Sequence, residues 1–339
     1  MLETIGYDPA MAWWAAAADA RIGRVARVDR GIAHVLTEAG PARAGFGAEL
    51  LCDIAGDVVA TPCAGDWVVL RQWPDHRETV HRVLPRRTAV VRAVAGEQSH
   101  GQVLAANADL VAVVVALQPL PVLARVERLV SLAWQSGGLP LVVLTKADAV
   151  TDAAQVAEDV AEAVPGVEVV SVSVVTGEGL DRLRDLIDGR LTLALIGSSG
   201  HGKSSLTNAV VGAPVLGTKE IRADGRGRHT TVRRELVPLP AGGAVIDTPG
   251  LRGLGLVGEG DGIARTFSDV EALAAGCRFA DCCHGDEPGC AVAEALSDGT
   301  LGQRRYDSWR KLRREAVFRA QRRDQRVREQ RTRHGKKAR

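Results

Sequence analysis

Between about residues 100 and 255, apolar residues gather in short unbroken runs bounded by polar or turn-forming residues. The predicted strands are Leu110–Leu117, Pro140–Leu144, Val167–Val172, Leu191–Ile196 and Ala244–Ile246. Such runs are typical of strands that are buried on both faces of a parallel sheet. Amphipathic stretches with helical spacing lie between some of them, at 125–134, 152–164 and 180–187. Strands that alternate with helices predict an α/β domain, whose ligands bind at the carboxyl ends of the strands.

The first 100 residues have a different pattern, in which short β-rich runs are separated by turns that contain glycine. The predicted strands are Arg21–Val28, Ile32–Leu36, Glu49–Ile54, Asp66–Arg71 and Thr79–Leu84. About five short strands at this spacing predict a small barrel, of which an oligonucleotide-binding (OB) fold is one form. A β-domain without a binding role fits the same pattern.

The composition, 46% hydrophobic and 25% charged, is that of a globular protein that buries a substantial core. The apolar runs are far shorter than the roughly 20 residues that span a bilayer. The N-terminus carries Glu3 and Asp8 but no basic residue before the short apolar run at 11–17, which argues against a secretory signal. We therefore expect a cytoplasmic protein without a membrane partner.

A net charge of +2 conceals a strong asymmetry along the chain. Residues 304–339 hold 16 Lys or Arg against 4 Asp or Glu, whereas residues 1–303 hold 27 basic and 37 acidic residues. A basic, helix-patterned end on an acidic body favours a polyanionic partner, although a solvated helix without a partner has the same composition.

A phosphate-binding motif follows the strand predicted at 191–196 and precedes a helical pattern. The motif G-S-S-G-H-G-K-S at 197–204 is a P-loop in its required strand–loop–helix context. The residues expected at the nucleotide are Gly197, Ser198, Ser199, Gly200, His201, Gly202, Lys203, Ser204 and Ser205. Backbone N–H groups of the loop and the helix N-terminus would bind the phosphates. Lys203 would reach the β- and γ-phosphates, and the Ser204 hydroxyl would ligate Mg²⁺.

A second motif selects the base and consists of Thr145, Lys146, Ala147 and Asp148. It resembles the N-K-x-D motif of GTPases, with Thr145 in place of the usual Asn. Asp148 would accept hydrogen bonds from guanine N1–H and the exocyclic amine, donors that adenine does not offer in that arrangement. Ser173 and Val174 begin a segment that resembles the fifth GTPase motif, where backbone groups would meet the guanine carbonyl. A lone T-K-x-D also fits an ordinary exposed turn. Five GTPase motifs that all lie at strand ends or in loops would rarely occur together by chance.

The motifs on the γ-phosphate side lie after the P-loop. Asp247-Thr248-Pro249-Gly250 matches D-x-x-G, so that Asp247 would hold Mg²⁺ through water and the Gly250 N–H would contact the γ-phosphate. The glycine-rich segment before it ends in Thr230 and Thr231, one of which is the expected switch I ligand of Mg²⁺. The base motifs precede the P-loop, whereas an ordinary GTPase has them last, so the order is circularly permuted. This order leads switch II, at 247–250, directly into the C-terminal region.

The group that activates the attacking water is not evident. Leu251 follows D-x-x-G where many GTPases carry a Gln that orients water, so intrinsic hydrolysis should be slow. His229, beside the switch I threonines, is the best internal candidate for a catalytic group. A structural or RNA-facing role for His229 is the alternative, and a partner could instead order the switch.

Four of the six cysteines lie within fourteen residues, and three of them form with His284 the pattern Cys277-x4-Cys282-x-His284-x5-Cys290. Three thiolates and one imidazole suit a closed, tetrahedral structural Zn²⁺ site. Cys283 competes with Cys282 on spacing alone, and free buried thiols are the alternative to a metal. The remaining two, Cys52 and Cys63, are expected to be small buried apolar residues.

Taken together, the motifs resemble those of the RsgA (YjeQ) family of bacterial GTPases that depend on the small ribosomal subunit. The matching segments are 145–148, 197–205, 227–231, 247–250 and 277–290, and the resemblance covers essentially the whole chain. It implies that Cys282 rather than Cys283 is a zinc ligand. Thr145 and His201 depart from the usual Asn and Val of the family, and neither change removes a phosphate or metal contact.

The resemblance implies three domains: an RNA-binding OB-fold β-barrel at 1–100, a circularly permuted α/β P-loop GTPase domain at 101–258, and a zinc-binding, mainly α-helical domain at 259–339. It implies GTP and GDP as substrate and product, with Mg²⁺ and one structural Zn²⁺ as cofactors. It further implies a role in late maturation of the 30S subunit, in contact with 16S rRNA, with hydrolysis stimulated by that particle. We expect a monomer. A GTP-dependent RNA-binding scaffold and a signalling GTPase with a protein partner are the alternatives.

Overall fold

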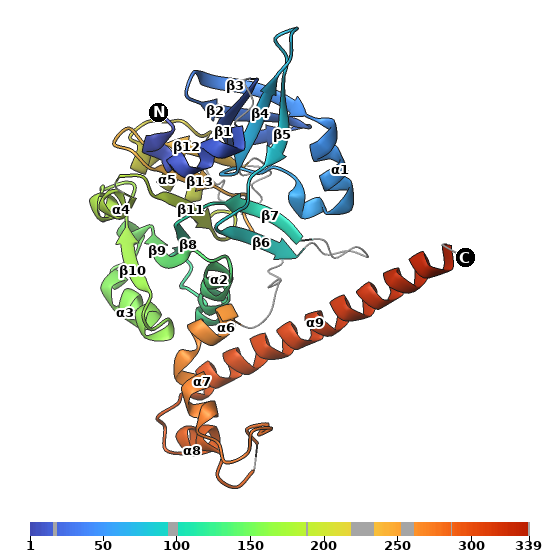
Figure 1. Cartoon of the computed structure of the whole chain (residues 1–339). Coiled ribbons are helices and arrows are strands. Elements are labelled where there is room, and N and C mark those ends of the chain that lie inside the picture. The colour runs from blue at the N-terminus through green and yellow to red at the C-terminus, as the bar shows by residue number, and fades with distance from the viewer. Residues whose placement is uncertain are drawn as a thin grey trace.

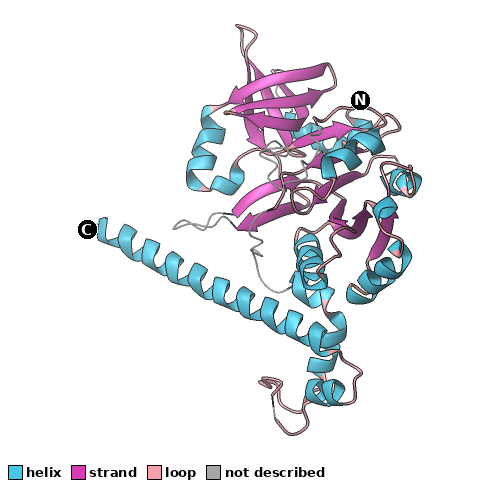
Figure 2. Ribbon diagram, turned by 180° about the vertical axis from the view of Figure 1, so that it is seen from behind, coloured by secondary structure: helices cyan, strands magenta, loops and turns pink. Residues whose placement is uncertain are grey.

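The computed structural model describes residues 1–15, 19–93, 101–187, 189–217, 234–251, 261–285 and 287–337. Figure 1 shows three parts in sequence order: a β-barrel at the top, a layered α/β part in the middle and a group of helices at the bottom. The last helix leaves this group and runs past the body of the molecule, so that it forms an arm (Figures 1 and 2).

The N-terminal part is a closed barrel with strand order β1-β2-β3-β5-β4. Its elements are η1 (Glu3–Ile5), η2 (Pro9–Ala15), β1 (Ala20–Asp29), β2 (Ile32–Thr37), β3 (Gly40–Phe46), α1 (Ala48–Gly56), η3 (Val58–Ala60), β4 (Trp67–Gln72) and β5 (Glu78–Val83). The neighbouring strands are antiparallel except for β3 and β5, which pair in parallel and close the barrel. Five strands in this order, with a helix between β3 and β4, form the predicted OB fold.

One strand predicted in the barrel is wrong. Residues 49–54 belong to helix α1, in which Leu50 is buried while Leu51 and Cys52 are exposed. Leu50 and Ile54 lie on the inner face one helical turn apart while Cys52 between them is exposed, whereas a strand would place all three on the same face. The expectation that Cys52 is buried is wrong for the same reason, whereas Cys63 is buried as expected. The true third strand, β3, was missed because two of its inward side chains, Ala42 and Ala44, are small.

The central part is a six-stranded sheet of order β10-β9-β8-β11-β13-β12. Its strands and helices are β8 (Leu110–Ala116), α2 (Leu123–Gln135), β9 (Leu139–Thr145), η4 (Ala147–Ala149), α3 (Ala153–Ala163), β10 (Glu168–Val172), α4 (Leu180–Ile187), β11 (Thr192–Ile196), α5 (Lys203–Val211), β12 (Glu235–Pro238) and β13 (Ala244–Asp247). All pairs are parallel except that edge strand β12 is antiparallel to β13. The predicted strands and helices of this part are confirmed. Strand β11, which leads into the P-loop, lies inside the sheet between β8 and β13.

A two-stranded sheet of β6 (Ala89–Ala93) and β7 (Gly101–Ala106) lies between the barrel and the large sheet. The buried Arg24 of β1 joins these parts: it donates hydrogen bonds to the carbonyl of Ile5, to that of Asn107 at 3.1 Å and to that of Gly65 at 3.4 Å. Burial lowers the pKa of Arg24 to about 10, so the guanidinium stays charged at neutral pH. The barrel is thereby tied to the segment that enters β8.

The C-terminal part contains α6 (Asp261–Thr266), α7 (Ser268–Ala275), α8 (Ala291–Ser297) and α9 (Gln303–Lys337). Its mainly helical character confirms the prediction. None of the described helices combines the length and the apolar character that crossing a membrane requires.

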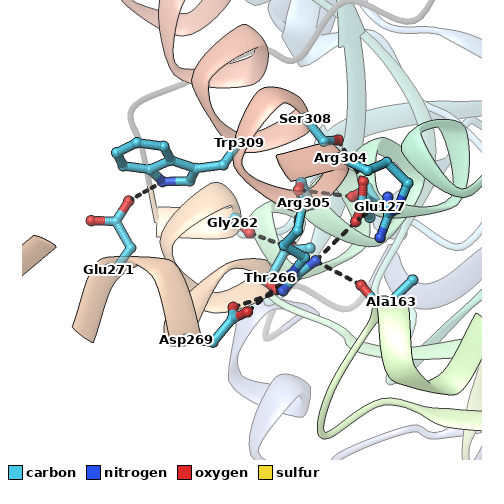
Figure 3. A network of polar contacts seen from close by, with 11 residues as sticks. Glu127, Ala163, Gly262, Thr266, Asp269, Glu271, Arg304, Arg305, Ser308 and Trp309 are labelled. Atoms are coloured by element: carbon cyan, nitrogen blue, oxygen red, sulfur yellow. Dashed lines mark hydrogen bonds and ion pairs between the residues drawn. The ribbon is translucent and has the colours of Figure 1, made fainter. Parts of the chain in front are cut away.

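A buried polar network joins α9 to α2 (Figure 3). Glu127 of α2 is fully buried and accepts hydrogen bonds from Arg304 and Arg305, each at 3.0 Å, and from the Ser308 hydroxyl. Arg305 also binds the Asp269 carboxylate through Nε at 3.0 Å and Nη2 at 2.8 Å. Its remaining donors reach the carbonyl oxygens of Ala163 and Thr266, both at 2.7 Å. The start of α9 is therefore fixed to the GTPase part by a charge pair whose groups are satisfied.

Candidate nucleotide site and metal centre

The P-loop lies at the carboxyl end of β11 and leads into α5, where phosphate sites of α/β sheets are expected. Gly197 has a φ of +153°, and a Cβ there would lie 2.3 Å from the carbonyl oxygen of Val114 on the neighbouring strand. Only glycine fits so close to another backbone. Gly202 also has a positive φ, at +80°, directly before the helix begins. These two glycines give the loop the shape in which its N–H groups can converge on an anion.

Lys203 folds back over the P-loop. Its ammonium donates to the carbonyl oxygens of Gly197 at 3.1 Å and Ser198 at 2.8 Å. The side chain is buried, and desolvation lowers the pKa of Lys203 to about 8, against the opposing effect of the Asp247 carboxylate. A buried ammonium with a depressed pKa gains most from an anion placed beside it.

Ser204 and Asp247 meet next to this lysine. The Ser204 hydroxyl donates to Oδ2 of Asp247 at 2.6 Å, and burial raises the pKa of that carboxyl. The other carboxylate oxygen, Oδ1, is buried and has no hydrogen-bond partner among the described residues. An unpartnered carboxylate oxygen beside a hydroxyl is a donor set that suits Mg²⁺, which prefers oxygen ligands. The residues present therefore fit the magnesium ion that the motifs predict.

The D-T-P-G segment lies directly against the P-loop. The Leu251 N–H donates to the carbonyl of Gly197 at 2.9 Å, and a Cβ on Gly250 would lie 2.5 Å from the backbone nitrogen of Ser199. Thr248, to which the motif assigns no role, has a buried hydroxyl that donates to the carbonyl of Leu195 on β11 at 2.6 Å. The start of switch II is thus held at the loop that would carry the phosphates. Leu251 is itself buried, so its side chain has no access to a water molecule at the phosphates.

The two base-recognition motifs, 25 residues apart, meet at the ends of the adjacent strands β9 and β10. The buried Ser173 hydroxyl donates to Oδ1 of Asp148 at 2.5 Å and accepts from the backbone nitrogens of Val175 and Thr176 at 3.2 and 3.1 Å. Asp148 is exposed, and Val174 is partly exposed beside it. Ser173 therefore orients the carboxylate while leaving the residue open to a ligand.

Thr145 connects the base motif to the P-loop. Its hydroxyl is buried and donates to the carbonyl oxygen of His201 at 2.9 Å. The His201 ring in turn lies with Nδ1 3.1 Å from the carbonyl of Val114, and burial lowers the pKa of this histidine. The two positions that depart from the usual family residues are thus in direct contact. Lys146 follows with a φ of +62°, which turns the chain toward Asp148.

Not every predicted site residue lies in the described part of the chain. His229, Thr230 and Thr231 fall in 218–233, outside the described residues, so their roles stay predictions.

Asn208 on α5 was missed, although its side chain holds the backbone of Leu216 through two hydrogen bonds of 2.8 Å. It fixes the chain between the P-loop helix and the switch I segment, and a polar residue inside a helix was its one signal in the sequence.

The predicted zinc ligands meet between α7 and α8. The ligand atoms of Cys277, Cys282, His284 and Cys290 all lie within 4.8 Å of one another. Nδ1 of His284 is 3.5 Å from the sulfur of Cys277 and 3.7 Å from that of Cys290. Cys283 is exposed and its sulfur lies 3.7 Å from the carbonyl of Asp281 instead. Three thiols and one imidazole at these separations fit a tetrahedral metal ion such as Zn²⁺.

A mostly parallel sheet with a P-loop at an inner strand, and with base motifs that precede it in sequence, defines the protein as a circularly permuted P-loop GTPase. A family model described as RsgA GTPase matches residues 83–257. The chain belongs to the RsgA GTPase family.

Named relatives agree with this assignment. The small ribosomal subunit biogenesis GTPase RsgA of Streptomyces avermitilis is 50% identical over 297 residues, which cover 86% of this chain and 79% of the relative. The protein of the same name from Streptomyces coelicolor is 48% identical over 86% of this chain and 80% of the relative. The crystal structure of YjeQ from Thermotoga maritima matches with a TM-score of 0.62 and 25% identity, over 88% of this chain and 99% of that one.

Proposed function

We propose that the protein hydrolyses GTP to GDP and phosphate during late maturation of the small ribosomal subunit in the cytoplasm. It binds the 30S particle as a monomer, in contact with 16S rRNA, and the particle stimulates hydrolysis. The observation that carries the proposal is the exposed Asp148 carboxylate, which Ser173 orients and whose motif is bonded to the P-loop through Thr145. The relatives, named as small ribosomal subunit biogenesis GTPases, support the choice of partner.

The P-loop residues predicted above bind the phosphates of GTP, with Lys203 at the β- and γ-phosphates. When bound, Mg²⁺ supplies positive charge to the phosphate oxygens, and Ser204 and Asp247 are the residues that would hold it. The Gly250 N–H donates to the γ-phosphate. Thr145, Lys146, Ala147 and Val174 complete the surroundings of the base, where Asp148 selects guanine.

The group that activates the attacking water lies outside the D-x-x-G motif and the residue that follows it. Since Leu251 is buried and carries no polar group, it does not orient water. His229 is the proposed catalytic group, with Thr230 or Thr231 as the switch I ligand of Mg²⁺. Stimulation by the 30S particle then means that the particle places His229 at the attacking water.

The cysteine cluster holds one structural Zn²⁺ through Cys277, Cys282, His284 and Cys290. Since all four ligands come from the protein, the site has no position for a substrate. The carbonyl of His284 accepts a hydrogen bond from the hydroxyl of Tyr306 at 3.1 Å, which ties the metal loop to α9. Metal binding would thus order the segment on which α9 rests.

A variant of Asp148 tests the base assignment. In Asp148→Ala, the affinity for GTP should fall at least 100-fold while the weak affinity for ATP stays unchanged, because only guanine offers two donors to the carboxylate. The matched control is Asp152→Ala, which removes an exposed carboxylate four residues away whose side chain caps no helix N–H. Titrations with fluorescent GTP and ATP analogues measure both affinities. An equal loss for both nucleotides, or an equal loss in the control, would contradict the assignment.

The alternative function is a scaffold that holds nucleotide without turnover. The wild-type protein with purified 30S subunits distinguishes it, since a scaffold binds the particle but releases no phosphate.

A further inference from the structure

A cavity of about 580 Å³ lies between α2 and α9, away from the nucleotide-binding residues described above. Its walls include four basic side chains, Arg125 and Arg128 from α2 and Arg304 and Lys311 from α9, against the single acid Asp307. The two helices come from parts of the chain that are almost 180 residues apart, so the buried Glu127 network is what brings these charges together. A concave surface with this charge favours an anionic ligand.

The four basic side chains differ in whether they already bind a carboxylate of this chain. Arg128 binds the Glu315 carboxylate with two hydrogen bonds of 2.6 Å, and Arg304 binds Glu127 at 3.0 Å. Arg125 and Lys311 are exposed, and their side chains form no hydrogen bond or ion pair with a described residue. These two are therefore the side chains that can turn to a ligand, while the charges of Arg128 and Arg304 are largely balanced by their carboxylate partners.

The basic helix that continues beyond the cavity favours an extended anion over a small one. Helix α9 continues beyond the cavity as an arm, and residues 304–339 carry 16 basic and 4 acidic residues (Figures 1 and 2). An anion that fills the cavity and also follows the arm must be an extended polyanion. Arg and Lys bind the phosphates of nucleic acids, and each phosphate contact releases counterions.

We propose that the cavity between α2 and α9 binds the phosphate backbone of RNA, with Arg125 and Lys311 as the contacting residues. The proposal rests on the proposed function, because it gives the rRNA of the particle a defined contact on this chain. It places that contact across the joint between the GTPase part and the C-terminal helices.

The position of Arg125 links this contact to the nucleotide site. Arg125 lies in the first turn of α2, which follows β8, and β8 pairs with the P-loop strand β11. Burial is the main cause that lowers the pKa of His201 in the P-loop, and the charge of Arg125 lowers it further by a smaller amount. An RNA phosphate at Arg125 would therefore change the electrostatic field at the loop that holds GTP.

The test compares three variants of the full-length protein. Arg125→Ala with Lys311→Ala removes the contacting cations, and Arg125→Lys with Lys311→Arg keeps the charge. Arg182→Ala with Arg190→Ala, near α4, removes the same charge elsewhere and serves as the control. The affinity for 30S subunits and for a 12-nucleotide oligouridine is measured at several salt concentrations, with GDP binding as the check that each variant is folded.

The alanine pair should bind 30S subunits and the oligouridine roughly tenfold more weakly, and the slope of log K against log salt should fall by about 1.5, as expected for two lost phosphate contacts. The charge-keeping pair and the control pair should bind like the wild type. Equal affinity and slope for the alanine pair and the control would overturn the cavity as an RNA site. If the wild type binds oligouridine but not 30S subunits, the proposed function fails, and the oligouridine results alone decide the cavity.

Discussion

Replacing Glu127 with glutamine tests whether the buried network holds the C-terminal helices on the GTPase part. Glutamine keeps the shape of the side chain but removes the charge that Arg304 and Arg305 share (Figure 3). Breaking a buried ion pair costs about 3–5 kcal/mol, because the remaining charge is left without a partner. Arg305 retains the Asp269 carboxylate and two carbonyl oxygens, which places the expected loss at the lower end.

The free energy of unfolding should therefore fall by about 3 kcal/mol, to which the half-exposed Arg304 contributes at most about 1 kcal/mol. For a chain of this size that corresponds to a decrease of roughly 4 °C in the apparent Tm. Thermal unfolding followed by circular dichroism measures it. Limited digestion with trypsin adds a local readout, since detachment of α9 makes the buried Arg305 accessible to cleavage.

Glu315→Gln is the matched control, because the Arg128–Glu315 pair joins the same two helices but its carboxylate is 31% exposed. A partly exposed pair contributes at most about 1 kcal/mol, so this variant should unfold closer to the wild-type temperature than Glu127→Gln. An unchanged Tm for Glu127→Gln, or an equal decrease in both variants, would refute the reasoning that burial makes the difference.

Three further predictions follow from single sites. Burial lowers the pKa of Lys203 to about 8, so between pH 8 and its ordinary value of 10.5 the unfolded chain binds the extra proton. The stability of the nucleotide-free protein should rise with pH across that range, while the affinity for GDP should fall because the phosphates require the ammonium. Thermal unfolding and GDP titrations at a series of pH values measure the two trends, and a pH-independent GDP affinity would contradict a depressed pKa. Cys277→Ser should abolish bound zinc in an elemental analysis while Cys283→Ser keeps one ion per chain; equal zinc contents would refute the ligand set. Trp73, 44% exposed at the end of β4 and stacked near Arg71, should contribute to RNA affinity by base stacking. Trp73→Ala should weaken oligouridine binding by about 1–3 kcal/mol and Trp73→Phe by much less, whereas an unaffected Trp73→Ala would exclude this contact.

The buried sheet was predictable because its strands are continuously apolar and alternate with longer amphipathic stretches. The P-loop, Asp148 and Asp247 were predictable because phosphate, guanine and Mg²⁺ each demand particular groups at particular spacings. The zinc ligands followed in part from composition, with the choice of Cys282 resting on the family resemblance.

The remaining features depend on tertiary contacts that no local pattern carries. Helix α1 was mistaken for a strand because Glu49–Ile54 is too short to separate a period of two from a period of four. The bond from Thr145 to His201 joins positions 56 residues apart, and the pair of Glu127 and Arg305 joins positions 178 apart. The predicted division at residue 100 falls between the paired strands β6 and β7 and stays a prediction.

The most direct test of the central claim is phosphate release from GTP and from ATP, each with and without purified 30S subunits. The site described here predicts slow release from GTP alone, strong stimulation of GTP hydrolysis by 30S subunits and little release from ATP in either case. Equal turnover of ATP would contradict guanine selection by Asp148, and GTP turnover indifferent to 30S subunits would contradict the proposed partner.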